Sequence, residues 1–171
     1  TWRITNAAAK AGAKPAVSGG TFSSAVLPEY CAIGFVPKDN SDGTYGVKAA
    51  EGNAAMFDAE GKLIGYKDVA AALANSNAKT VKLIKDVTDS AVNVILHSGV
   101  ILDLNGHALT AEFVYAPLGG DAGIIDSAVK GGGTGKLLLK DMKTSMGYTD
   151  GYMPIYAGQE DGLHCYKFYT V

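Results

Sequence analysis

The part of the chain from residue 80 to residue 142 is a succession of short apolar segments, each ended by a turn signal. Most boundaries have a glycine preceded by serine, asparagine or glycine, as in Ser98-Gly99, Asn105-Gly106 and Gly119-Gly120. Runs of four to nine apolar residues between such turns are typical of β-strands, whereas a globular helix usually needs a longer periodic pattern. The segments are TVKLIKDV (80–87), AVNVILH (91–97), VILDL (100–104), ALTAEFVYA (108–116), GIIDSAV (123–129) and GKLLLKDM (135–142).

The corner between two of these strands is the sharpest local prediction. Asn105 and Gly106 tolerate left-handed backbone angles, so Asp103-Leu104-Asn105-Gly106 is expected to turn the chain between short strands. Leu102, Leu104 and Leu109 surround this corner and are expected to point inward and stack.

Composition agrees with a turn-rich β protein. Glycine accounts for 22 of 171 residues and charged residues for only 19%. The formal net charge of −2 comes from well-mixed acidic and basic residues, which excludes the electrostatic footprint of a nucleic-acid-binding protein or of a protein that binds anionic membranes. No apolar run has the length that a membrane-spanning helix needs.

The remaining segments predict one helix and three hairpins. YKDVAAALANSNAKT carries an apolar face with helical spacing, which predicts a helix over about residues 66–78. A hairpin is expected over residues 39–47 around Asp42-Gly43, and a second one pairs residues 55–57 with residues 63–66. Residues 151–171 are expected to form a third hairpin with its turn between residues 159 and 162.

The predicted fold class is mainly β, built as short right-handed parallel β-helix-like coils with one capping helix and flanking hairpins. Continuous apolar strands argue against a sandwich in which one face of each strand points to water. Leu83 and Leu102 are 19 residues apart and Leu102 and Ile124 are 22 apart, which suits a three-sided coil of short strands. The helix would then cover the open end of the coil.

One longer stretch, AAALANSNAKTVKLIKDVTDSAVNVILHSGVILDLNGHALT, resembles the first coils of right-handed parallel β-helix (β-solenoid) modules in large surface proteins of Gram-positive and gut bacteria. The segment AVSGGTFSSAVLPEYCAIGFVPKDNSDGTYGV resembles the end of such a module. The chain departs from that family in having only about three coils. The resemblance implies three segments: residues 1–50 end one β-helix-like module, 51–145 hold the helix and the coils, and 146–171 form a C-terminal hairpin. It also implies an extracellular, cell-surface, adhesin-like role.

Several patterns suggest chemistry, and none of them makes a complete site. Stacked aspartates at strand ends could bind calcium or act as in sugar-cleaving β-helices, but aspartate beside a corner more often accepts backbone hydrogen bonds. The glycine-rich segment 130–136 lacks the spacing of a phosphate loop, and DNSDG (39–43) is better explained as a turn. The three histidines are scattered. We therefore assign no catalytic, cofactor-binding or metal-binding residue; the side chains considered are Asp103, Asp126, Asp141, His97, His107 and His164.

Tyrosines crowd the C-terminal part of the chain. On a β surface they could stack on sugars or anchor a protein partner, or they could simply cover a small hydrophobic core. The candidate ligand platform consists of Tyr148, Tyr152, Tyr156, Tyr166 and Tyr169. A disulfide between Cys31 and Cys165 would tie the two ends together, and the alternative is two buried thiols.

The leading functional hypothesis is a non-enzymatic structural or adhesive module of an extracellular bacterial surface protein or filament. Its expected partners are copies of itself or neighbouring modules, and possible further partners are host or cell-wall glycans. Residues 1–5 and 167–171 are candidate edge strands for pairing between copies. Two alternatives remain: a carbohydrate-binding module that uses the C-terminal tyrosines, and a fragment of a polysaccharide-degrading enzyme that needs Asp103 and Asp126 close together.

Overall fold

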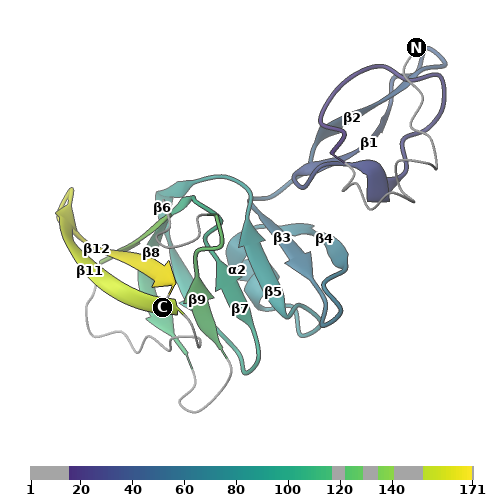
Figure 1. Ribbon diagram of the computed structural model, residues 1–171. Coiled ribbons are helices and arrows are strands. Elements are labelled where there is room, and N and C mark those ends of the chain that lie inside the picture. Colours follow the sequence, from purple (N-terminus) through teal and green to yellow (C-terminus); the bar gives the residue numbers. More distant parts are fainter. Residues whose placement is uncertain (1–15, 117–121, 129–134, 141–151, 171) are drawn as a thin grey trace. The chain divides into compact units, whose positions relative to one another are not determined.

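The computed structural model describes residues 16–116, 122–128, 135–140 and 152–170 (Figure 1). The chain divides into two compact units, Thr1–Glu51 (unit 1) and Gly52–Val171 (unit 2). The described part is mainly β, as its sequence predicts, with one short α-helix.

Unit 1 is built around a two-stranded antiparallel sheet. A 3-10 turn, η1 (Pro28–Tyr30), precedes β1 (Phe35–Asp39), which pairs with β2 (Tyr45–Ala49). The Asp42-Gly43 pair lies in the connection, where Gly43 has a φ of +80° and the Asp42 carboxylate accepts a hydrogen bond from a backbone N–H two residues later. The predicted hairpin at 39–47 is therefore confirmed.

Unit 2 contains two five-stranded sheets with strand orders β4-β3-β5-β7-β9 and β11-β12-β10-β8-β6. From β5 onward the chain alternates between the two sheets, so that β5, β7 and β9 are parallel neighbours in one and β6, β8 and β10 in the other. The strands are β3 (Ala54–Phe57), β4 (Leu63–Lys67), β5 (Thr80–Leu83), β6 (Val87–Ile95), β7 (Ile101–Asp103), β8 (Ala108–Tyr115), β9 (Gly123–Ile125), β10 (Lys136–Leu139), β11 (Tyr152–Glu160) and β12 (Leu163–Thr170).

The prediction of β-helix-like coils, and the family resemblance on which it depended, are wrong. Both sheets are mixed, and neither is closed or solenoid-like. The outer side of β5 is occupied by β3, and the outer side of β10 by β12, each of them antiparallel. Parallel pairing therefore involves three strands in each sheet: an antiparallel hairpin occupies one side of each run, and β9 and β6 are the edges on the other side.

The hairpins themselves lie where the sequence predicts them. β3 and β4 pair antiparallel across the Glu60-Gly61 turn, and β11 and β12 pair across the turn at Asp161-Gly162. Within β12, residues 164–166 lie between β10 and β11, whereas residues 167–170 are in register with β11 alone among the described strands, so the expectation that residues 167–171 form an edge strand stays a prediction.

The helix α2 (Val69–Leu73) is shorter than the predicted span of residues 66–78. Tyr66 and Lys67 instead belong to β4, where they pair with Ala55 and Ala54. The helix starts where the Asn53 side-chain oxygen accepts a hydrogen bond from the Val69 backbone N–H at 2.7 Å. No helix of the described residues has the length and hydropathy needed to cross a membrane.

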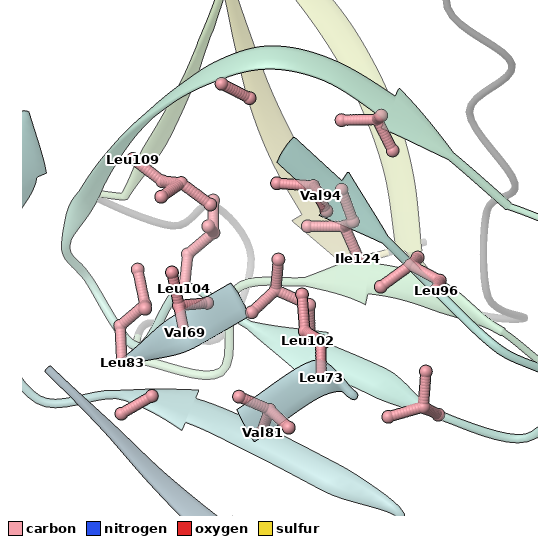
Figure 2. Packing of buried hydrophobic residues seen from close by; sticks show 14 of the residues in the cluster. Val69, Leu73, Val81, Leu83, Val94, Leu96, Leu102, Leu104, Leu109 and Ile124 are labelled. Carbon is pink, nitrogen blue, oxygen red and sulfur yellow. The ribbon is translucent and has the colours of Figure 1, made fainter. Parts of the chain in front are cut away.

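One hydrophobic core joins both sheets and the helix. Figure 2 shows side chains from α2 and from strands of both sheets directed toward one another, with Val69 and Leu73 contributed by the helix. Leu102, Leu104 and Leu109 are fully buried in this cluster, as the corner between β7 and β8 predicts. That corner has the expected left-handed backbone, with φ of +48° at Asn105 and +81° at Gly106.

Neighbouring segments pack closely around Gly135, which directly precedes β10, and this packing can be tested. A Cβ atom placed there would lie 2.9 Å from the backbone oxygen of His107 and 2.9 Å from a carboxylate oxygen of Asp126. Gly135→Ala is therefore expected to lower the free energy of unfolding by about 1–3 kcal/mol, measured by urea denaturation. Gly19→Ala, at a position with open space around it in unit 1, is the matched control. Equal midpoints for Gly135→Ala and the unsubstituted chain would contradict the packing described here.

Candidate functional site

Asp103, at the end of β7, is a buried carboxylate surrounded by donors. Only 1% of the residue is exposed, and its oxygens accept hydrogen bonds from the backbone N–H groups of Asn105 at 2.9 Å and Ser127 at 3.0 Å. The Ser127 hydroxyl also donates to it, and the Lys82 ammonium lies 3.3 Å away. The carboxylate thus connects its own turn to the turn that follows β9.

Asp126, which follows β9, has the same role one strand further on. It is also 1% exposed, and it accepts hydrogen bonds from the backbone N–H groups of Gly106 at 2.8 Å and Gly135 at 2.7 Å. A third N–H, from Ala128, lies at 3.3 Å. One carboxylate therefore satisfies amides from two connections, the corner between β7 and β8 and the segment between β9 and β10, which would otherwise lack a partner.

Asp86 forms the corresponding contact between β5 and β6, at a more exposed position. Its carboxylate accepts a hydrogen bond from the Ala108 backbone N–H at 3.0 Å and lies 3.1 Å from Nδ1 of His107. The backbone hydrogen bond from Ala108, and then the contact with His107, hold the pKa of Asp86 below its usual value.

The buried aspartates are occupied by donors of the fold itself. Asp126 and one oxygen of Asp103 accept backbone amides, as expected for aspartate beside a corner. The other oxygen of Asp103 faces the Ser127 hydroxyl and Lys82. Asp141 lies outside the described residues. Within the parts of the chain that the structure describes, no group of three or more histidine, cysteine or acidic side chains could hold a metal ion.

The three histidines have three separate environments. His107 contacts Asp86, while His97 contacts the backbone oxygen of Ser98 through Nδ1. His164 packs beside Tyr156. The glycine-rich segment considered as a phosphate loop lies mostly outside the described residues.

Part of the predicted tyrosine platform comes together on the C-terminal hairpin. Tyr156 on β11 faces Tyr166 on β12 with ring centroids 5.5 Å apart, and its ring is 6.1 Å from that of His164. The rings are tilted by 55° and 44°, so they do not form one flat platform. Tyr156 is 47% exposed, whereas Tyr166 packs partly against the core. We call Tyr156, His164 and Tyr166 the aromatic cluster.

The other platform tyrosines do not add to this cluster. Tyr152 and Tyr169 are in β11 and β12, but their side chains fall outside the described part, as does the whole of Tyr148. Cys31 lies in unit 1 and Cys165 in unit 2, and the disulfide between them stays a prediction. Burial raises the pKa of the Cys165 thiol, which makes it a poor nucleophile near neutral pH.

A surface that sequence reasoning missed lies on the outer side of β6 and β8. Val94 and Val114 are paired and buried, at 0% and 2% exposure, so their neighbours along each strand point outward. Those neighbours are Ile95, Phe113 and Tyr115, at 53%, 37% and 55% exposure, which we call the outer patch. Ile95 and Tyr115 are directly paired across the two strands.

A groove of about 370 Å³ adjoins the outer patch where α2 packs beside β6. Its lining is mainly apolar, with Asn93 and His97 as its polar residues, and shares Ile95 with the patch. The lining residues are Ala70, Leu73, Ala74, Asn93, Ile95 and His97. The only signal in the sequence is that "FVYA" (113–116) is apolar on both faces of the strand, which by itself does not say which face is buried.

Comparisons with known proteins return nothing for this chain: no family model, curated protein or solved structure matches it.

The lowered pKa of Asp86 predicts a contribution to acid stability. Because the folded pKa lies below the usual value of 3.8, ionised Asp86 stabilises the fold above that value. This contribution is lost as the pH falls through the lowered folded pKa. Asp86→Asn is therefore expected to make the urea midpoint of unit 2 less dependent on pH between about pH 5 and pH 2. Asp89→Asn, on exposed β6 backbone, is the control; an Asp86→Asn variant that keeps the full acid dependence would contradict the assignment.

Proposed function

We propose that this chain is a non-enzymatic structural and adhesive module that works by contact with protein partners. The observation that carries the proposal is the outer patch, where Ile95, Phe113 and Tyr115 stand together on the water-facing side of β6 and β8. Contiguous exposed apolar side chains with an aromatic component mark protein interaction sites more often than ordinary surface.

The groove beside the patch adds to this proposal. It is lined by small and apolar side chains of α2 and by Ile95, so a partner that covers the patch can also insert a side chain there. β6 lies at the edge of its sheet, and Asn93 to Ile95 keep a regular register with β8. An edge strand of this kind offers backbone groups to a partner.

The buried polar side chains also support a structural role, because they are used to hold the fold together. The two buried aspartates, which are the groups most suited to catalysis, are occupied by backbone amides and, at Asp103, also by the Ser127 hydroxyl and Lys82. The alternative of a polysaccharide-degrading enzyme needs Asp103 and Asp126 close together, and the two are near neighbours because Asp103 pairs with Ile125. The donors that already occupy both carboxylates argue against it. The expected partners are copies of this chain or neighbouring modules, and the extracellular, cell-surface location stays a prediction.

The outer patch gives a direct test of self-association. The mass of the full chain is measured by size exclusion with light scattering over a concentration series up to about 1 mM, where even weak association is visible. The mass is expected to rise with concentration, and Tyr115→Ser should weaken that association roughly tenfold or more, as for an interface hot spot.

Ile64→Ser is the matched control, because Ile64 is an exposed apolar side chain on β4 in the other sheet. It should leave association unchanged. A strict monomer at every concentration, or an equal effect of both variants, would contradict the proposed role of the patch in contacts between copies.

The aromatic cluster supports carbohydrate binding as a second candidate. Tyr156 presents a half-exposed ring, and Nδ1 of His164 is buried without a hydrogen-bond partner in the described part of the chain. Beside the hairpin, Lys136 and Glu160 form an ion pair. Together these groups offer one ring for stacking and polar groups for sugar hydroxyls.

A glycan array followed by calorimetry on any glycan that binds tests this second candidate. Tyr156→Ala is expected to weaken binding roughly tenfold, because a stacking residue at a binding site contributes at about the level of a hot spot. Tyr115→Ala, an equally exposed tyrosine away from the cluster, should keep the original affinity. Absence of binding by the unsubstituted chain across the array would argue against this function.

A further inference from the structure

We propose that the corner at Asn105-Gly106 is a latent deamidation site that the carboxylate of Asp126 holds closed. This is the sole Asn-Gly pair in the sequence. Glycine after asparagine favours the reaction because it leaves the following backbone nitrogen unhindered. The inference concerns the corner alone and does not depend on the proposed function.

The reaction is an intramolecular displacement. The Gly106 backbone nitrogen attacks the side-chain amide carbon of Asn105, so that a C–N bond forms and closes a five-membered succinimide. The bond from that carbon to Nδ2 breaks, and the proton from the Gly106 nitrogen leaves with it as part of ammonia. Water then opens the ring, which gives aspartate or isoaspartate at position 105.

Both reacting groups of this corner are tied to other parts of the fold. The Gly106 N–H donates to Asp126 Oδ1 at 2.8 Å, and Nδ2 of Asn105 donates to the backbone oxygen of Leu83 at 3.0 Å. The Asn105 backbone N–H is held by Asp103 at 2.9 Å. The attacking nitrogen of Gly106 and the leaving amide group of Asn105 are therefore both held by hydrogen bonds to other parts of the fold.

The charge of Asp126 strengthens this protection. The Gly106 nitrogen must lose its proton to become a nucleophile, and the resulting anion would lie beside a buried carboxylate at hydrogen-bond distance. Two negative charges so close in a poorly solvated site repel strongly. Deamidation is thus confined to moments when the corner opens and Gly106 leaves Asp126.

The product would not fit the closed corner. An aspartate at position 105 replaces the donor that faces the Leu83 oxygen with a negatively charged acceptor, close to the carboxylate of Asp103. Isoaspartate also lengthens the main chain within the turn that leads from β7 into β8. A corner that is deamidated while open is therefore expected not to form its original hydrogen bonds again.

The test measures deamidation of the full chain at mildly alkaline pH by mass spectrometry of the peptide that contains Asn105. The folded chain is expected to react at least tenfold more slowly than the chain in denaturing urea, because the open corner is a minor state. Equal rates for the folded and unfolded chain would overturn the proposal without the need for any variant.

A pair of variants separates local protection from overall stability. Asp126→Asn keeps the size of the side chain but removes its charge, and it should speed deamidation of the folded chain roughly tenfold. Leu73→Ala makes a cavity in the core at α2 without removing a hydrogen bond of the corner, and is compared at a urea concentration that gives the same free energy of unfolding. If the two variants then deamidate at the same rate, Asp126 has no specific protective role and the proposal is wrong.

Discussion

Two buried carboxylates hold the turns of unit 2, and the rest of that unit depends on them. Asp103 and Asp126 are each 1% exposed, and each accepts N–H groups from turns that are far apart in the sequence. An acceptor that is charged and buried is stable only when several donors converge on it. The positions of the turns are therefore fixed relative to one another, and the short strands between them are brought into register.

This arrangement also explains where the chain can act on other molecules. The buried carboxylates, which are the side chains best suited to catalysis, form hydrogen bonds inside the fold. We therefore expect binding to other molecules on the surfaces that the strands leave exposed. Alternation along β6 and β8 buries Val94 and Val114 and turns Ile95 and Tyr115 outward as a consequence. The same hydrogen bonds that shape the corner also protect Asn105 from reaction, which links the stability of the fold to its chemical lifetime.

Local predictions from the sequence were correct where short-range forces decide. The left-handed backbone at Asn105-Gly106 and the hairpin turns at Asp42-Gly43 and Asp161-Gly162 follow from residue type alone. The coil prediction failed because strand pairing is a long-range choice. Ala54 and Ala55 give no sign in the sequence that β3 pairs antiparallel with β5, yet that pairing closes one side of the parallel run. The pairing of the same two alanines with β4 takes Tyr66 and Lys67 out of the predicted helix.

The candidate sites divide in the same way. The sequence by itself determined that this is a mainly β chain with short apolar strands, sharp asparagine-glycine and aspartate-glycine turns, and aromatic residues near its C-terminus. Only the tertiary structure decided that Tyr156 and Tyr166 meet while Phe113 and Tyr115 face water, and that Asp126 reaches Gly106 and Gly135. The physical reason is that turns are set by the backbone energies of a few adjacent residues, whereas burial and pairing depend on which distant strands compete for the same edge.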